Sequence, residues 1–176
     1  MIDTHAHIDF ESFDQDRDEM IEKAFNSGVD TIVIPGVEPK DYDKILNLSN
    51  KYDKIFCAMG VHPHNANDYN DEIKHKIISN AQNHNVKAIG EIGIDYYYDY
   101  ADSNTQKKVF REQLKIAKEL KLPVIVHNRE ADEDIFNILK EEQNGNLNAV
   151  LHCFSSDVEF MKKSVDLGLH ISFTGI

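Results

Sequence analysis

The sequence is poor in cysteine, in positive charge and in long apolar runs. Its 176 residues include only Cys57 and Cys153, far apart in the chain, which argues against a disulfide framework or a thiolate zinc site. Acidic residues outnumber basic ones by 31 to 19, and the net charge of −12 argues against nucleic-acid binding through a basic patch. No apolar run reaches the roughly 18 residues of a membrane span, and no signal-peptide pattern follows Met1. We therefore expect a soluble, cytoplasmic protein in a reducing compartment that does not contact membranes.

Apolar residues make up 41% of the chain and charged residues 28%, which suits a single domain, residues 1–176, with a hydrophobic core. Short β-branched runs alternate with segments of helical period, and no low-complexity linker separates them. Strands are expected at residues 2–7, 30–35, 55–62, 86–93, 123–127, 149–152 and 169–173. The clearest helix is expected at residues 105–120, and another begins near Asp16 and stops at Gly28.

This alternation predicts a parallel sheet with right-handed crossovers, which fits either a doubly wound sheet or a (β/α)8 barrel. Polar groups lie at or just beyond the ends of five strands: His5 and His7, His62 and His64, Glu91, His127, and His152. A doubly wound sheet gathers its ligands at one switch point, whereas a closed sheet brings all its strand ends together. No G-x-G-x-x-G or P-loop lysine motif indicates a nucleotide site. We predict a (β/α)8 TIM barrel, here with seven strands and without the closing strand.

The first expected strand carries two histidines with the spacing of metal ligands. Because side chains alternate with a period of two, His5 and His7 face the same side and can chelate one metal ion. Two solvated or core histidines are the alternative for this motif alone. Asp3 has the same parity and is interpreted either as a partner for an imidazole N–H or as an ordinary terminal charge.

Glu91 lies between Gly90 and Gly93 in an apolar strand, where an unpaired charge is costly. Metal coordination would offset this cost, and the two oxygens of a carboxylate can bridge two cations. A structural salt bridge is the alternative. His127 and His152 each end an apolar run, and this repetition favours metal ligation over two hydrogen-bonded core histidines.

The remaining candidates lie at the expected rim of the barrel. His62 and His64 follow the third strand in a loop, where they could contact a substrate phosphate, donate protons or simply be solvated. Arg129 has the parity of His127 and could reach a phosphate from the rim, or form an ion pair with a nearby acid.

Four tyrosines follow Glu91, and they could stack on bases or pack between helix and sheet: Tyr96, Tyr97, Tyr98 and Tyr100. Cys153 should point away from His152 into the strand–helix layer, as a packing residue.

Six ordered motifs cover the chain: D-T-H-A-H at 3–7, G-V-H-P-H at 60–64, G-E-I-G-I-D-Y at 90–96, H-N-R-E-A at 127–131, H-C-F-S at 152–155 and S-F-T-G at 172–175. Together they resemble the TatD family of metal-dependent deoxyribonucleases, which belongs to the amidohydrolase-like barrels. The resemblance implies two ligand sets that share one carboxylate: His5, His7 and Glu91 for one metal, and Glu91, His127 and His152 for the second. It also implies a phosphate-facing set: His62, His64 and Arg129.

The activity that this resemblance implies is hydrolysis of DNA phosphodiester bonds by a water that two divalent cations activate, with Glu91, His62 and His64 as catalytic residues. Zinc, manganese or iron is expected ahead of magnesium, because the ligands are rich in imidazole. DNA or another nucleic acid is the expected substrate, with the cations offsetting the negative charge of the protein, and no obligate protein partner is evident. The alternatives are a hydrolase of an ester or amide bond, such as that of D-aminoacyl-tRNA, and a metal-binding scaffold without turnover.

The family pattern includes one further ligand, an aspartate in a T-D-x-P motif on the last strand, and the sequence stops at Ile176 before any such motif. A (β/α)8 domain typically has about 250 residues. We therefore expect the functional protein to continue past Ile176 with a closing strand, since the first and seventh strands would otherwise be unpaired edges.

Overall fold

The sheet consists of seven parallel strands arranged in sequence order. The structure is a computed structural model, and it describes residues 1–143 and 147–174. The strands are β1 (Ile2–Asp3), β2 (Thr31–Ile34), β3 (Ile55–Met59), β4 (Val86–Asp95), β5 (Val124–Arg129), β6 (Ala149–Leu151) and β7 (His170–Ile171). Each strand pairs with the next one along the chain, from β1 to β7. A doubly wound sheet would reverse its strand order at a switch point, so the prediction of a TIM-barrel type of fold with seven strands is confirmed.

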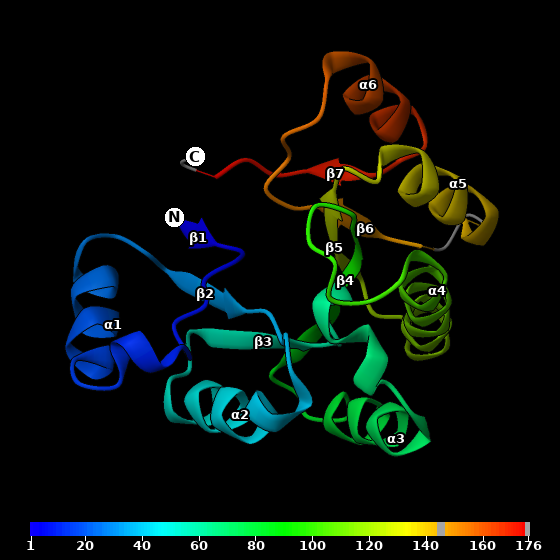
Figure 1. The fold of residues 1–176 in the computed structure, drawn as a ribbon. Coiled ribbons are helices and arrows are strands. Elements are labelled where there is room, and N and C mark those ends of the chain that lie inside the picture. Colours follow the sequence, from blue (N-terminus) through cyan, green and yellow to red (C-terminus); the bar gives the residue numbers. More distant parts are fainter. Residues whose placement is uncertain (144–146, 175–176) are drawn as a thin grey trace.

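In the described part of the chain there are six α-helices, and Figure 1 shows them around the outside of the curled sheet. They are α1 (Arg17–Asn26), α2 (Tyr42–Lys51), α3 (Asp71–Asn80), α4 (Ser103–Leu120), α5 (Asp132–Glu142) and α6 (Val158–Asp166). Three 3₁₀ helices lie in the connections: η1 (Glu11–Phe13), η2 (Pro39–Asp41) and η3 (Pro63–Asp68). α4 begins two residues before the expected start at Thr105, because the side chain of Asp102 caps it by accepting from the N–H groups of Asn104 and Thr105.

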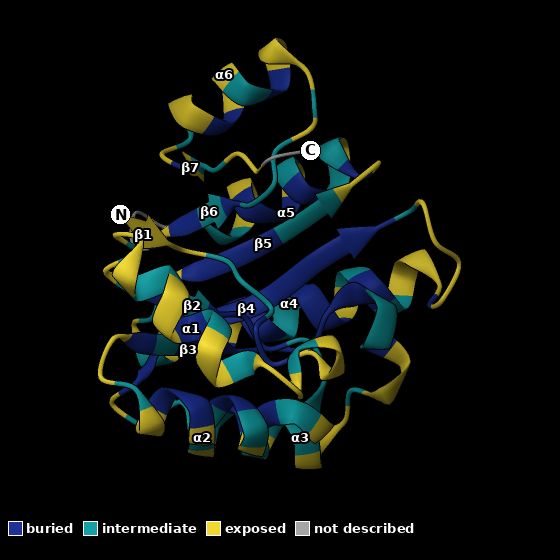
Figure 2. Cartoon of the chain, turned by 90° about the vertical axis from the view of Figure 1, so that its left-hand side faces the viewer, coloured by how far each residue is buried: buried dark blue, intermediate teal, exposed yellow. Residues whose placement is uncertain are grey.

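All seven expected strands are present, but several expected boundaries are wrong. β1, β3 and β7 are shorter than expected, and the residues beyond them continue as irregular chain. β4 and β5 are longer, and they reach Asp95 and Arg129. Figure 2 shows why: β4 is buried along almost its whole length, since strands lie on both sides of it and helix α4 packs against it. β4 and β5 pair with each other up to Asp95 and Arg129, and they carry regular structure to the same level at the C-terminal edge of the sheet.

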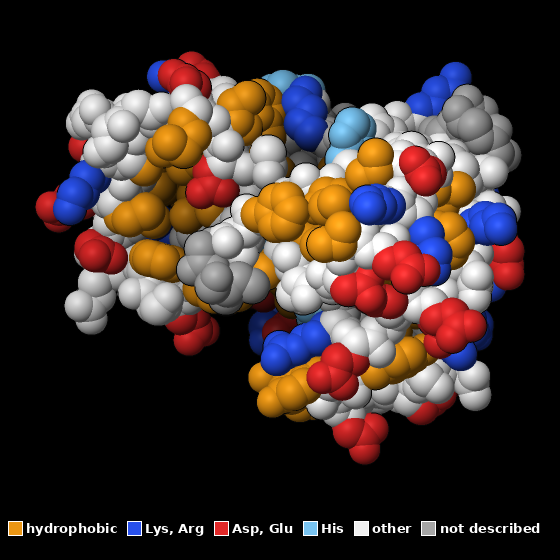
Figure 3. All heavy atoms as spheres, turned by 90° about the horizontal axis from the view of Figure 1, so that it is seen from above, with side chains coloured by type: hydrophobic (Ala, Val, Ile, Leu, Met, Phe, Trp, Pro, Cys, Tyr) orange, Lys and Arg blue, Asp and Glu red, His pale blue; other side chains and the backbone are white. Residues whose placement is uncertain are grey.

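Charges of both signs are mixed on one face of the molecule. On the face seen in Figure 3, lysine and arginine side chains lie among aspartate, glutamate and apolar side chains. In the described part of the chain, no helix combines the length and the apolarity that crossing a membrane requires.

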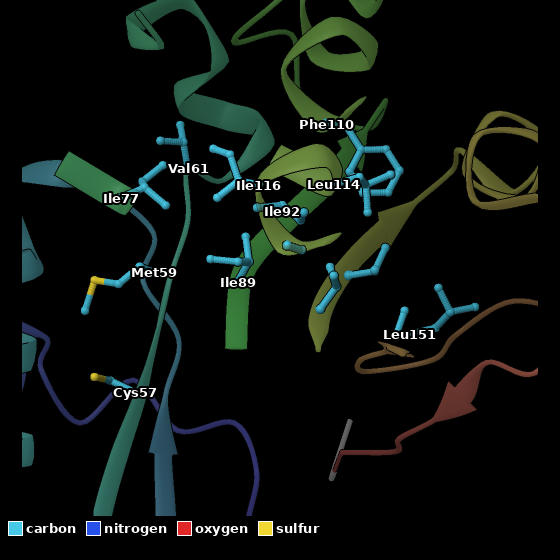
Figure 4. Packing of buried hydrophobic residues seen from close by; sticks show 14 of the residues in the cluster. Cys57, Met59, Val61, Ile77, Ile89, Ile92, Phe110, Leu114, Ile116 and Leu151 are labelled. Atoms are coloured by element: carbon cyan, nitrogen blue, oxygen red, sulfur yellow. The ribbon is translucent and has the colours of Figure 1, made fainter. Parts of the chain in front are cut away.

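Two apolar clusters lie on opposite faces of the sheet. The larger cluster joins the strands to the surrounding helices and includes Phe110 and Leu114 of α4 (Figure 4). The smaller cluster comes from the strands alone: Ala58, Ala88 and Ile125, with Val33 and Val150 against them. This second face is therefore the inner face of the curled sheet.

Candidate metal centre

Glu91 is the centre of a histidine cluster at the C-terminal edge of the sheet. It lies in β4, and only 3% of its surface is exposed. Its glycine neighbours let β4 approach β5 closely. A Cβ at Gly93, where φ is +150°, would lie 2.0 Å from the carbonyl oxygen of His127, and a Cβ at Gly90 would lie 2.7 Å from Cβ of Ile125. The two glycines therefore allow the close approach that brings Glu91 beside His127.

One carboxylate oxygen of Glu91 faces the two histidines that follow β1. Nε2 of His5 lies 3.2 Å and Nε2 of His7 lies 3.6 Å from Oε2 of Glu91. These two Nε2 atoms are 3.2 Å apart. Although β1 ends before His5, the chain stays beside β2 because the N–H of Ala6 donates to the carbonyl oxygen of Val33 at 3.1 Å. The structure therefore brings the expected chelating pair together.

The other oxygen of Glu91 faces three histidines from three further strand ends. Nε2 of His152 lies 2.6 Å, Nδ1 of His127 lies 2.9 Å and Nε2 of His62 lies 3.6 Å from Oε1. His127 belongs to β5, while His152 follows β6 directly. The rings of His5 and His152 stack at a centroid distance of 4.0 Å, which joins the two sides of the carboxylate.

The loop after β3 is more constrained than the sequence indicated. We expected His62 and His64 in a loose loop, but His62 is only 7% exposed and forms part of the cluster, so solvation of His62 is excluded. His64 is half-buried, and its Nε2 lies 2.9 Å from Oδ2 of Asp95. Proline at the first position of η3 and a hydrogen bond from the N–H of His64 to Nδ1 of His62 fix this turn.

Asp95, at the end of β4, is a site residue that we did not single out from the sequence. Its Oδ2 lies 2.9 Å from Nε2 of both His64 and His127, and its Oδ1 accepts the backbone N–H groups of Tyr97 and Tyr98 at 3.0 Å. It has the same strand parity as Glu91, within the G-E-I-G-I-D-Y motif, and that signal could have identified it.

Two buried glutamines of α4 hold the strand ends that carry these groups. The side-chain amide of Gln113 accepts from the N–H of Val61 at 2.7 Å and donates to its carbonyl oxygen at 3.0 Å. Gln106 makes the same pair of bonds with Asp95, at 2.9 and 3.0 Å, and also donates to the carbonyl of Ala101. α4 thus fixes the backbone beside His62 and at the end of β4.

The electrostatics of the cluster are those of a cation site. Burial by itself would raise the pKa of Glu91, but hydrogen bonds from His127, His152, His5 and His62 hold it well below its usual value. Burial lowers the pKa of His7 to about 4, more than Glu91 raises it. His127 is the exception: burial lowers its pKa, but hydrogen bonds to Asp95 and Glu91 outweigh this and raise it to about 9. The same two carboxylates would favour a divalent cation in this place.

The residues present fit divalent cations. Among the described residues, the buried Nδ1 atoms of His5, His7 and His152 have no hydrogen-bond partner, and a single carboxylate cannot satisfy five imidazoles. Two groups of residues each offer three ligand atoms, and the atoms within each group lie within 4.8 Å of one another. One group is His5, Glu91 and His152, and the other is His62, Glu91 and His127. These groups share Glu91, as the expected ligand sets do, but they distribute the histidines differently. A bridging carboxylate with imidazoles on both sides can hold two cations.

Arg129 lies beside the centre at the rim, together with Tyr97, Tyr98 and Tyr100. Arg129 forms no ion pair among the described residues; instead its guanidinium lies 4.0 Å from the ring centroid of Tyr97 and 5.1 Å from that of Tyr98. The interpretation of Arg129 as half of an ion pair is therefore wrong. Tyr96 differs from the other tyrosines: it packs against the core, and its hydroxyl donates to Asp134.

Three smaller expectations have different outcomes. Asp3 is exposed and accepts the backbone N–H of His5 at 3.1 Å, so it holds the turn and not an imidazole. Cys153 does not point into the strand–helix layer, because its φ of 48° turns the chain and its Sγ lies 2.9 Å from the hydroxyl of Thr174. Gly175 of the S-F-T-G motif and Ile176 lie outside the described residues.

Comparisons with known proteins identify the family to which the chain is similar. The family model described as TatD related DNase matches residues 2–176. The chain is 38% identical over 175 residues to YabD of Bacillus subtilis, an uncharacterized metal-dependent hydrolase, and covers 69% of that protein. It is 32% identical over 175 residues to the 3'-5' ssDNA/RNA exonuclease TatD of Salmonella typhimurium, and covers 67% of it. In both cases the alignment includes 99% of this chain.

Solved structures show the same fold. The crystal structure of the TatD homolog YJJV from Escherichia coli matches 97% of this chain with a TM-score of 0.90 and 31% identity. A hydrolase TatD family protein from Entamoeba histolytica matches 98% of it with a TM-score of 0.88 and 27% identity. The chain covers 66% and 64% of these two proteins, so it spans about two thirds of the length of the relatives that it matches.

Proposed function

The chain belongs to the TatD-related DNase family of metal-dependent hydrolases. We propose that it hydrolyses the phosphodiester bonds of DNA, and that the reaction takes place at the site centred on Glu91. The observation that carries this proposal is the convergence of five imidazoles, from four strand ends, on the two oxygens of this one buried group. Because a salt bridge needs only one cationic partner, five histidines around one carboxylate favour metal ligation instead.

The ligands proposed for the two cations follow the two oxygens of Glu91. His5 and His7 lie on the Oε2 side, and His127 and His152 lie on the Oε1 side. Cations bound there would lower the pKa of a water molecule and bind the phosphate oxygens. Zinc, manganese or iron suits these imidazole ligands better than magnesium does.

The side chains at the mouth of the site bind and orient the phosphate in this proposal. His64 is bonded through Nε2 to Asp95 and is partly exposed, so its ring can donate a hydrogen bond to the phosphate or a proton to the leaving oxygen. His62 is held against Glu91, so in this proposal it contacts the phosphate from the buried side of the site. Arg129 supplies a cation at the rim, which offsets part of the negative charge of the protein.

The test is an assay of one metal-reconstituted preparation on a single-stranded DNA oligonucleotide, on RNA of the same sequence and on D-aminoacyl-tRNA. We expect oligonucleotide cleavage that EDTA abolishes and that Mn²⁺ or Zn²⁺ restores. Release of the amino acid without cleavage of either oligonucleotide would identify a carbonyl hydrolase instead. Metal binding without any product would identify a scaffold, and either result refutes the proposal.

A further inference from the structure

An exposed row of aromatic rings lies beside the candidate metal centre. Tyr97, Tyr98 and Tyr100 are 54%, 40% and 60% exposed, although large aromatic side chains are normally buried. The ring centroids of Tyr98 and Tyr100 are 5.5 Å apart, and the two ring planes are inclined to each other by 29°. The ring of His64 adjoins both, edge-on to Tyr98 at a centroid distance of 5.2 Å and tilted by 54° to Tyr100 at 4.8 Å. The row therefore leads from the surface to the imidazole that we place against the phosphate.

The backbone of this row is held by the residues of the centre and not by a loose loop. Oδ1 of Asp95 accepts the N–H groups of Tyr97 and Tyr98, while its Oδ2 contacts His64 and His127. Because Asp95 makes all these contacts, the row and the imidazoles have a fixed relative position.

The far end of the row is also anchored. The side chain of Asn67 donates to the carbonyl oxygen of Tyr100 at 2.9 Å, and Gln106 donates to that of Ala101 at 2.8 Å. A surface that is ordered before binding loses little conformational entropy when a ligand arrives.

The charge around the row indicates that affinity for a nucleic acid comes from the neutral faces of the rings and not from contacts with phosphates. The net charge of −12 repels a polyanion, and the one cation in contact with the row is Arg129, among the described residues. Stacking on aromatic rings does not require positive charge, and every base has a π-face to offer. Bases inside a duplex are already stacked on both faces, whereas every unpaired base has a free face for such a surface.

We propose that Tyr98 and Tyr100, beside the ring of His64, form a stacking platform for unpaired bases of the nucleic-acid substrate. This inference rests on the proposed function and assigns the contact with unpaired bases, next to the reacting phosphate, to these two side chains. Tyr97 supports the guanidinium of Arg129, which lies where the backbone of a stacked strand would pass.

The test compares binding to two fluorescent single strands with phosphorothioate linkages, one complete and one with abasic nucleotides at its last three 3' positions. Fluorescence anisotropy is measured with the Mn²⁺-loaded chain. Replacing both tyrosines by alanine (Tyr98→Ala and Tyr100→Ala) should weaken binding of the complete strand by about tenfold. The abasic strand should bind equally well to both proteins, within about twofold. The matched double phenylalanine variant retains the rings and should bind as the unchanged chain does.

A control variant separates the platform from a general loss of apolar surface. Val165→Ala removes an exposed side chain from α6, which carries no residue of the centre, and should leave both affinities unchanged. Equal weakening on both strands, or none on either, would overturn the platform. Because anisotropy needs no turnover, base-dependent binding without cleavage would refute only the proposed function, and cleavage without base dependence would refute only the platform.

Discussion

Replacing Glu91 by glutamine tests the centre most directly, because one side chain serves both halves of it. Glutamine keeps the size of the side chain but removes the negative charge that faces five imidazoles. A cation bound at a concentration 100 times its Kd stabilises the native state by about 2.7 kcal/mol per site. For a chain of this length, that corresponds to a rise in Tm of about 5–10 °C for one site and about twice as much for two. The unchanged chain should show this rise when Mn²⁺ or Zn²⁺ is added, and Glu91→Gln should show little of it.

The same variant should lose activity for the same reason. Metal chemistry contributes several kcal/mol to such a reaction, so we expect cleavage to fall by about 10³-fold or more. Metal content is measured by mass spectrometry after gel filtration, and Tm by calorimetry. Glu119→Gln is the matched control, since Glu119 is an exposed carboxylate on α4. A Glu91→Gln protein that keeps two metals and its metal-dependent rise in Tm would refute the bridging role.

His64→Ala should separate metal binding from activity. It should keep the metal content and the metal-dependent rise in Tm, while cleavage falls by about 10²-fold, as expected for a lost proton donor. If His64→Ala loses a metal instead, His64 is a ligand and its assignment to the phosphate is wrong.

Three further predictions concern the fold and the two thiols. Phe110→Ala should lower the free energy of unfolding by about 3–5 kcal/mol in urea titrations, whereas exposed Lys115→Ala should change it by less than about 0.5 kcal/mol. Gln106→Leu should cost at least about 2 kcal/mol, because it leaves buried backbone groups of β4 without partners; an unchanged urea midpoint would contradict this. Burial raises the pKa of Cys57 to about 11, so thiolate forms only as the pH rises toward that value. At pH 8 iodoacetamide should therefore label Cys153 alone in the native protein, and mass spectrometry of the peptides would reveal any labelling of Cys57.

The strands and their order could be predicted because each of them is an apolar run between helical segments. The ends of the strands could not, because regular pairing depends on neighbours far along the chain. His5 and His7 illustrate the difference: their alternation gave the correct common side, although they lie outside β1. The bond from Ala6 to β2 keeps that segment extended, and no local pattern indicates it.

The candidate site was predictable to a similar extent. Histidines at strand ends are visible in the sequence because a polar residue interrupts an apolar run. The burial of His62 was not visible, since the groups that hold this segment lie far along the chain: Glu91 contacts its ring, and Gln113 of α4 is bonded to the backbone of Val61. Asp95 was missed because the side chain of an aspartate that follows a strand is usually exposed to solvent. Only the fold brings His64 and His127 to it.

The two glutamines of α4 also determine how that helix is aligned with the sheet. An apolar helix face can slide along a strand layer and exchange one aliphatic contact for another at little cost. Gln106 and Gln113 lie two helical turns apart, and each is bonded to both the N–H and the C=O of a single residue. A shift of α4 by one residue would break both sets of bonds at once and leave buried polar groups unmatched. The pair therefore selects one alignment among many that the apolar surface would tolerate, and an insertion or deletion inside α4 should be far more harmful than a substitution there.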